Sequence, residues 1–420
     1  MSIVNQRRKT ENMQKGRLGG RQLSLDLVVE ILKKLPSKSL VRFRCVSKQW
    51  STIINSRRDF IEAIVNRSLL SHQQQQHQPP MFIFHHCVPE TFFTFSSTFS
   101  ESIRPAVSIS GSPDYHAFGY HYVRGLICCY SIFYQLVTIY NHTTRQSLRL
   151  PVIEAPVTEF RRLYCHFGYD PVMDQYKVMS ILVDFREFTQ TFHVFTLGSD
   201  KSWRRIQGID DEQLLPSVDG VCIQGTIYYG ATRATKKESC GETVDFRMTF
   251  DRGETVLLSF HIRSERFYHV SAPEPMLQAL SSGLLIDRAL LNHQGKLVCI
   301  GCCGEEKDDD DNDLTSMWVF ENTEKQEWSK ITFDLPELPL FCLNGDFTGF
   351  SGFTPAGEIF VTQYRYFFDK PVYVYYYDMN RNCFRRVEIQ GTRPEKKTKK
   401  PGTVKVFGIH DHVENTMFLS

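Results

Sequence analysis

The chain has 420 residues, enough for about two to four domains of ordinary size. Lysine plus arginine (49) and aspartate plus glutamate (47) nearly cancel, and the net charge of +2 provides no strong field for attracting nucleic acid or an anionic membrane. Aromatic residues make up 13% of the chain, which favours strands over most of its length. We therefore expect a multidomain α+β protein that binds neither nucleic acid nor membrane.

Residues 1–21 are polar and rich in dispersed arginine and lysine, and they lack the apolar core of a signal peptide. We expect a disordered basic tail, which serves either as a nuclear import signal or simply as a solvated terminus. The 12 cysteines show no scaffold-like spacing, which predicts buried thiols in a reducing compartment. The expected location is the nucleus, the cytoplasm or both.

Residues 22–70 have helical apolar spacing and form the first predicted domain. Leu27, Ile31 and Leu35 follow one another at four-residue intervals, and Pro36 ends this first helix. Three further short helices are expected. Their predicted start signals are Ser37 or Ser39 for the second, Ser47 for the third, and Asp59 with Glu62 as a capping box for the fourth.

This helical domain carries more large apolar side chains than about fifty residues can bury by themselves. The surplus predicts a permanent partner protein, although packing against the rest of the same chain is an alternative. Residues 71–80 (SHQQQQHQPP) are polar and end in prolines, which predicts a linker to the region 81–420.

A unit of about 59 residues recurs five times beyond residue 110. In each copy an aromatic residue ends a strand, a polar turn follows, and a large apolar residue comes seven or eight positions later. The aromatic residues that end these strands are Tyr140, Phe195, Phe260, Phe320 and Tyr377. A glycine followed by a short alternating strand precedes four of the copies, at Gly125, Gly225, Gly295 and Gly357. Such strand-rich repeats predict an all-β, propeller-like domain.

The segments 81–87 and 91–99 are predicted to pair with 403–409 and 416–419 as a sixth, closing blade. Joining the two ends of the β-region in one sheet would remove exposed sheet edges. A five-bladed ring and a pair of stacked sheets remain alternatives. The period exceeds that of an ordinary blade because of two insertions, 232–254 and the acidic run 305–313.

No catalytic, metal or cofactor pattern is convincing. Cys299, Cys302 and Cys303 lack a second pair at zinc-ribbon distance, and the sequence 410–412 (HDH) is explained equally well by a surface turn. The acidic run lacks the glycine turn of a calcium loop, and no glycine loop is followed by the lysine of a phosphate-binding loop. We expect a protein that is not an enzyme and that needs no cofactor.

The strings LSLDLVVEILKKLP (23–36) and KSLVRFRCVSKQW (38–50) resemble the F-box. The match covers about thirty positions and departs from the family at Ser24, where proline is usual. The β-region resembles the kelch-like F-box-associated domain of plant F-box proteins. This second resemblance spans about 110–390 and depends on Gly125, Tyr140, Trp203 and the string FGYDP (167–171).

The resemblance implies a substrate-recognition subunit of an SCF-type ubiquitin ligase. In this family the F-box binds a Skp-type adaptor, which joins cullin and RING subunits, and the β-domain binds an unknown protein substrate. The rivals are an adaptor-bound interaction module without a role in ubiquitination, and a glycan-binding or enzymatic propeller. The residues expected to contact the adaptor are Leu23, Leu25, Leu27, Ile31, Leu32, Leu35, Pro36, Leu40, Phe43 and Trp50.

Overall fold

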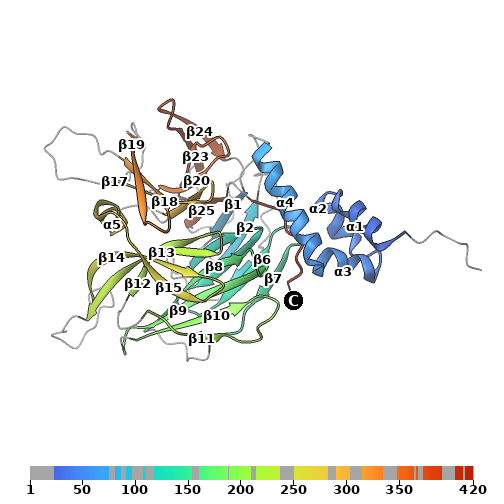
Figure 1. Cartoon of the computed structure of the whole chain (residues 1–420), viewed down its shortest axis with the longest axis horizontal. Coiled ribbons are helices and arrows are strands. Elements are labelled where there is room, and N and C mark those ends of the chain that lie inside the picture. The colour runs from blue at the N-terminus through green and yellow to red at the C-terminus, as the bar shows by residue number, and fades with distance from the viewer. Residues whose placement is uncertain are drawn as a thin grey trace, which may run out of the picture.

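Helices gather on one side of the molecule, and sheets form the rest of it (Figure 1). This arrangement confirms the predicted α+β class, with a small helical unit ahead of an all-β region. The computed structural model describes residues 23–74, 81–86, 91–96, 107–109, 118–153, 160–187, 189–209, 214–236, 250–281, 290–302, 315–333, 348–363, 366–367, 372–389, 403–409 and 412–419. The predicted basic tail 1–21 lies outside these residues.

Four helices form a small unit, called the helical head below: α1 (Leu25–Lys33), α2 (Ser37–Phe43), α3 (Lys48–Ser56) and α4 (Arg58–Gln74). Serine hydroxyls begin two of them. Ser24 accepts a hydrogen bond from the backbone N of Leu27 (3.4 Å), and Ser47 accepts one from Trp50 (3.1 Å). The apolar residues buried in the head come from all four helices: Val28, Val29, Leu32, Leu40, Ile53, Ile54, Phe60 and Ile64.

Three local predictions for the head are wrong. Neither Ser37 nor Ser39 caps α2, because Pro36 occupies the cap position and the Ser37 hydroxyl donates to Glu414 instead. The predicted capping box of α4 does not form, because Glu62 binds Arg124 in the β-region. The linker does not begin at residue 71, because α4 continues through 71–74, where no proline interrupts it.

Five four-stranded antiparallel sheets, called the first to fifth blades in chain order, supply most of the β-region. The first and second blades contain β4 (Phe118–Val123), β5 (Leu126–Ser131), β6 (Val137–Asn141), β7 (Gln146–Arg149), β8 (Arg161–Asp170), β9 (Gln175–Asp184), β10 (Thr189–Thr196) and β11 (Arg204–Ile206). The third to fifth contain β12 (Leu214–Ile223), β13 (Thr226–Lys236), β14 (Phe250–His261), β15 (Arg266–Val270), β16 (Leu290–His293), β17 (Lys296–Cys302), β18 (Thr315–Asn322), β19 (Glu327–Phe333), β20 (Thr348–Phe353), β21 (Ile359–Gln363), β23 (Val372–Asp378) and β24 (Cys383–Ile389). A fifth helix, α5 (Glu274–Ser281), follows the third blade.

The recurring aromatic residue of the sequence lies near the end of the third strand of each blade, and the apolar residue after the turn lies on the fourth strand or, for Trp203, just before it. The two side chains pack together, as in the second and fourth blades: the ring centroids are 5.5 Å apart for Phe195 and Trp203, and 4.5 Å apart for Phe320 and Trp328. Each of these tryptophans also donates its indole N–H to a backbone carbonyl just after the preceding blade, Pro151 or Ser271 (2.6 and 2.7 Å). The repeat therefore holds blades together as well as building them.

A sixth sheet joins the two ends of the β-region, in the order β22 (Tyr366–Phe367), β25 (Thr403–Ile409), β1 (Met81–His86), β2 (Thr91–Ser96) and β3 (Val107–Ile109). Met81 pairs with Ile409 in this sheet, so the predicted closing pairing of 81–87 and 91–99 with 403–409 is confirmed. Residues 416–419 do not join the sheet. They run beside the helical head instead, because their backbone groups bond to the head and to the first blade.

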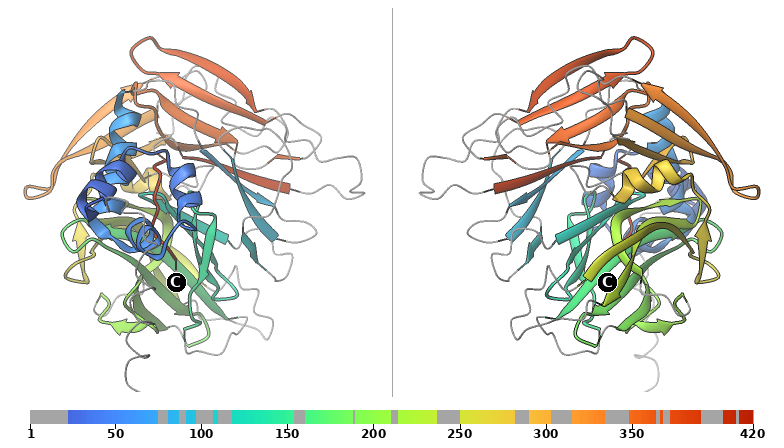
Figure 2. Two further views of the ribbon diagram at one scale, coloured as in Figure 1. Left: turned by 90° about the vertical axis from the view of Figure 1, so that its right-hand side faces the viewer. Right: turned by 90° about the vertical axis from the view of Figure 1, so that its left-hand side faces the viewer.

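Short hairpin turns line one face of the ring formed by the blades. Gly125, Gly225, Gly295 and Gly357 have φ between +81° and +87°, which explains why the predicted glycines recur there. The turns lie next to one another around the ring: a side chain at Gly225 would meet Pro171, and one at Gly295 would meet Gln224. The helical head covers part of this same face (Figure 2), which we call the head side of the ring.

Candidate functional site

Four exposed apolar side chains lie on the first helix and just before it, and we call them the exposed row. Leu23 is 53% exposed, Leu25 45%, Leu27 47% and Ile31 42%. The side of α1 opposite Leu27 and Ile31 is buried in the head, and α1 lies away from the sheets (Figure 1). The expected surplus of apolar surface is therefore present, and the β-region of the same chain does not cover it.

The remaining predicted adaptor contacts divide into two groups. Pro36 is exposed, whereas Leu35, Phe43 and Trp50 are half-buried against the head core. The Phe43 and Trp50 rings meet edge to face, with centroids 5.7 Å apart. Trp50 thus packs against the core of the head, while part of its surface stays accessible.

Leu32 and Leu40 must be removed from the predicted contact set. Both are 0% exposed and belong to the head's own core. The four-residue spacing in α1 places Leu27 and Ile31 along one stripe, but Leu32 lies one residue further round the helix and faces inward. A partner would reach these two side chains only by opening the head, so their role is to hold the helices together.

Exposed basic side chains accompany the apolar row on the outer part of the head. Lys34, Lys38, Arg42 and Lys48 are all exposed. Asp26 and Glu30 on α1 are exposed too, so the head carries exposed charges of both signs, and its charge does not select an acidic partner.

One polar cluster joins the head directly to the ring. The Arg124 guanidinium, in the β4–β5 turn, lies 2.9 Å from both carboxylate oxygens of Glu62 on α4 and stacks over the Tyr169 ring at 4.4 Å. Burial opposes the charged form of Arg124, but neighbouring Tyr176 and Glu62 outweigh it and raise the pKa of the guanidinium. The Tyr169 hydroxyl donates to Asp174 at 2.8 Å, and burial raises the pKa of that phenol.

The two edges of the ring differ in the connections that they carry. The short turns at Arg124, Asp174 and Gln224 lie on the head side. Strands β13 and β17 begin at this side and therefore end, at Lys236 and Cys302, at the opposite edge. The described chain leaves the ring at that opposite edge before 237–249 and 303–314, which lie outside the described residues.

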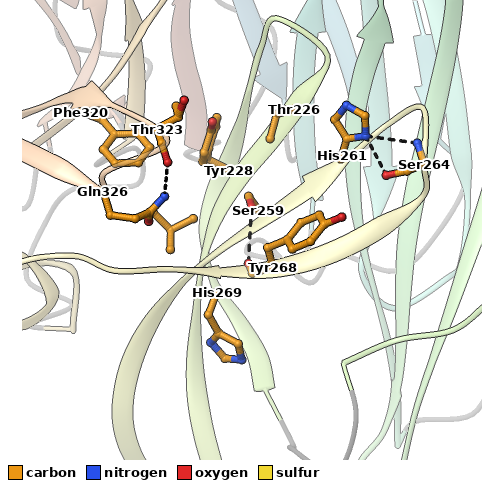
Figure 3. A pocket seen from close by; sticks show the side chains of 11 residues that line it. Thr226, Tyr228, Ser259, His261, Ser264, Tyr268, His269, Phe320, Thr323 and Gln326 are labelled. Carbon is orange, nitrogen blue, oxygen red and sulfur yellow. Dashed lines mark hydrogen bonds between the residues drawn. The ribbon is translucent and has the colours of Figure 1, made fainter.

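A pocket of about 760 Å³ lies between the third and fourth blades, reaching the head side of the ring (Figure 3). Tyr228 and Phe320 contribute aromatic surface from the two blades, and Tyr268, which is 51% exposed, lies on the outer strand. His261 contacts the Ser264 hydroxyl (2.7 Å). The described lining contains no Asp, Glu, Lys or Arg. Such a surface suits an uncharged group, and it lacks the carboxylate pair that glycoside hydrolysis requires.

Of the cysteines singled out in the sequence, Cys299 is fully buried in β17, and Cys303 lies outside the described residues. Cys128, Cys129 and Cys165 are also buried, and burial raises the pKa of each thiol. No group of metal-ligating side chains is found among the described residues. The described helices include none that is long and apolar enough to span a membrane.

Comparison with known families agrees with both halves of this geometry. Residues 21–62 match the F-box domain, and residues 79–413 match the F-box associated beta propeller domain. The chain belongs to the F-box proteins that carry this propeller. The F-box match covers α1 to α3 and the start of α4, so the exposed row of α1 lies within the F-box.

Relatives from Arabidopsis thaliana cover nearly the whole chain. "F-box protein At1g52495" is 53% identical over 94% of this chain and 87% of its own length. "F-box protein At1g30790" is 30% identical over 94% of this chain and 98% of its own length. Among solved structures, the WD40 domain of SCAP from fission yeast aligns with 80% of this chain and 97% of that chain, at 7% identity and a TM-score of 0.34.

Proposed function

We propose that this F-box protein is the substrate-recognition subunit of an SCF-type ubiquitin ligase. The F-box binds a Skp-type adaptor, and through it cullin and RING subunits, while the propeller binds the protein to be modified. The chain itself performs no chemistry in this role. It raises the local concentration of the target's lysines near the ubiquitin-conjugating enzyme.

The exposed row on α1 is the observation that carries this proposal. Burying each leucine or isoleucine against a partner is worth about 1.5–3 kcal/mol, so four such side chains can anchor a stable interface. Helix α1 lies away from the ring, so an adaptor can bind it while the propeller holds a target.

The test is binding of the full-length chain to purified Skp-type adaptor. Leu27→Asp combined with Ile31→Asp places two carboxylates in the row, and we expect affinity to fall by about 100-fold or more. The matched control is Leu70→Asp, because Leu70 is 57% exposed on α4 of the same head but lies outside the row. Unchanged adaptor binding by the folded double variant would contradict the proposal.

Ubiquitination must then be measured separately from adaptor binding. Reconstitution with cullin and RING subunits distinguishes a ligase receptor from an adaptor-bound module that never supports transfer. Proteins captured by the full-length chain under proteasome inhibition provide the candidate targets. Only those modified in the reconstituted reaction support the receptor role.

The pocket between the third and fourth blades is our first candidate for target contact, because it combines an exposed tyrosine with a hollow on the head side of the ring. Tyr268→Ala should reduce the capture and modification of such a target without changing adaptor affinity. Val387→Ala is the control, because Val387 is also exposed (44%) on an outer strand but lies in the fifth blade. Equal effects of the two substitutions would exclude the pocket.

A further inference from the structure

The last described segment of the chain, 412–419, belongs to no helix or strand, yet four of its eight residues are buried. Val413 is 4% exposed and Leu419 7%, while Asn415 and Thr416 are fully buried. The segment follows the closing strand β25 and passes between the ring and the helical head (Figure 2). Irregular backbone is normally found at the surface, so burial of this segment requires specific hydrogen bonds.

Asn415 supplies those bonds on the ring side. Its backbone N donates to Thr143 Oγ1 (2.9 Å), and its Nδ2 donates to the Arg124 carbonyl (2.8 Å) and to the Tyr176 hydroxyl (2.9 Å). Its Oδ1 accepts from the backbone N of Met417 (2.8 Å). All of the side chain's polar atoms are thus used, which fixes this residue between the first and second blades.

Further contacts hold the same segment to the ring. The Asn141 side chain donates to the Met417 carbonyl (2.8 Å), and Leu419 packs into the core shared by the first two blades. The fit at Gly125 is close, because a Cβ added there would lie 2.6 Å from the Cβ of Asn415. The ring therefore holds the segment by side-chain hydrogen bonds, an apolar anchor and close packing.

Glu414 and Phe418 reach the helical head from the other side of the segment. The backbone N of Glu414 donates to Ser68 on α4 (3.0 Å), and its carboxylate accepts from the Ser37 hydroxyl on α2 (2.6 Å). Its carboxylate also lies 3.7 Å from Arg67. The backbone N of Phe418 donates to the Asn55 carbonyl at the end of α3 (3.1 Å). One short segment thus contacts three of the four helices.

The direct contact between head and ring is modest by comparison. The Glu62–Arg124 ion pair is partly exposed, with 39% and 23% of the two side chains accessible, and such pairs contribute about 0–1 kcal/mol. Arg124 also depends on the segment, because Asn415 binds its backbone carbonyl. The contacts of 412–419 therefore carry most of the described polar connection between the two units.

We propose that residues 412–419 form a strap that sets the direction of the adaptor-binding row relative to the propeller. Glu414, Asn415 and Phe418 are then positioning residues for the ligase, a role that depends on the proposed function. Transfer of ubiquitin to a target held by the ring requires a defined separation between the two units, and a loose head would lower the effective concentration of target lysines.

The test loosens the head side of the strap in the full-length chain. Glu414→Lys with Phe418→Ala reverses a charge beside Arg67 and removes the ring next to Arg44, and both altered side chains are accessible (47% and 36%), so the blades should stay folded. The matched control is Glu388→Lys with Val387→Ala on the exposed strand β24.

Two measurements on these variants report on the strap itself. Backbone amides of 412–419 should exchange with deuterium about tenfold faster or more in the strap variant. Small-angle scattering should show a larger maximum dimension than in the unaltered chain or the control. Unchanged exchange and scattering would overturn the proposal.

Adaptor affinity separates this proposal from the proposed function. It should stay within about twofold of the unaltered chain, because the row on α1 lies away from the strap. If the unaltered chain itself fails to bind the adaptor, the ligase assignment fails, while exchange and scattering still decide whether the strap holds the head. In a reconstituted reaction with an identified target, the strap variant should show slower transfer at equal target binding.

Discussion

The helical head and the ring differ in how their exposed apolar side chains are distributed. The head exposes four large apolar side chains on α1 and just before it, whereas the exposed large apolar residues of the ring are scattered over different blades, as at Val172, Tyr268, Ile331 and Val387. The ring closes on itself through β1 and β25. The head has too few residues to bury all of its large apolar side chains. The contrast supports the proposed role of the head as the part of the chain that binds an adaptor.

The ring buries a charged side chain, and removing the partner of that charge is expected to have the largest effect on stability. Lys177 is 8% exposed and donates to the Ile262 carbonyl (3.1 Å) and to Glu265 (2.7 Å), joining the second and third blades. Glu265→Ala would leave this ammonium buried without its carboxylate and should lower the free energy of unfolding by about 3–5 kcal/mol. Chemical denaturation measures the change. Glu358→Ala removes the partner of the exposed Arg385, and a loss as large there would contradict the explanation by burial.

The contribution of the same ion pair to stability should depend on pH. Burial by itself would raise the pKa of Glu265, but hydrogen bonds from Arg204 and Lys177 outweigh it and hold the pKa below its ordinary value. Because the folded pKa is lowered, the stabilisation is present above the ordinary carboxyl pKa of about 4.3 and is lost as the pH falls through the folded value. The stability difference between the unaltered chain and Glu265→Gln should therefore be full at pH 7 and shrink below about pH 4. A difference that grew on acidification would contradict the predicted sign.

A matched pair of substitutions on α1 compares the buried side of this helix with its exposed side. Leu32→Ala removes a fully buried side chain and should destabilise the head by about 2–5 kcal/mol. Leu27→Ala removes a side chain that is 47% exposed and should change stability by less than about 0.5 kcal/mol while weakening adaptor binding. Thermal unfolding and adaptor titration on both variants separate the effects. Similar unfolding temperatures for the two would show that the division of α1 into core and contact sides is wrong.

A comparison of two turn glycines separates the effect of close packing between the ring and the strap from the effect of backbone strain. Gly125 and Gly357 have φ of +87° and +85°, so alanine at either position brings similar backbone strain of about 1–2 kcal/mol. Only at Gly125 would the added Cβ also meet Asn415 and the Val413 carbonyl, whereas nothing lies within 4 Å of the position at Gly357. Gly125→Ala should therefore destabilise more than Gly357→Ala in denaturant titrations. Equal losses of stability would show that the strap can move away from the added Cβ at little cost in free energy.

The smallest expected effects concern the helix caps of the head. Ser47→Ala removes a hydrogen bond of 3.1 Å to the backbone N of Trp50 and should cost about 1 kcal/mol. Ser24→Ala removes a longer contact of 3.4 Å, at the position where the family usually has proline, and should cost less. Far-ultraviolet circular dichroism during thermal unfolding compares the two. A larger loss at Ser24 would mean that this serine matters more for starting α1 than its geometry indicates.

Local patterns in the sequence predicted most of the architecture. The five aromatic-turn units correspond to the third and fourth strands of five blades, and the four recurring glycines occupy turns with positive φ. The closing sheet followed from strand-like segments at both ends of the β-region. Each of these features depends on a few neighbouring residues or on a repeat, which is why it could be predicted without knowledge of the packing.

Predictions that required knowledge of distant partners failed. Ser37 and Glu62 have the sequence context of helix-start signals, but their side chains bind Glu414 and Arg124 from remote parts of the chain. Residues 416–419 alternate like a strand, but their hydrogen bonds go to Asn55 and Asn141. Leu32 and Leu40 matched the apolar pattern of the F-box without indicating which side of the head they face.

By itself the sequence determined the order of the two units, the F-box, the number of repeats and the presence of apolar surface in excess of what the head can bury. Tertiary structure alone decided which apolar residues remain exposed, that the short turns and the head share one face of the ring, and that the C-terminal segment lies between the two units. The physical reason is the distance along the sequence over which each kind of interaction acts. Strand periodicity, caps and turns depend on interactions within a few residues, whereas burial and side-chain hydrogen bonding join positions such as Ser37 and Glu414 that are 377 residues apart.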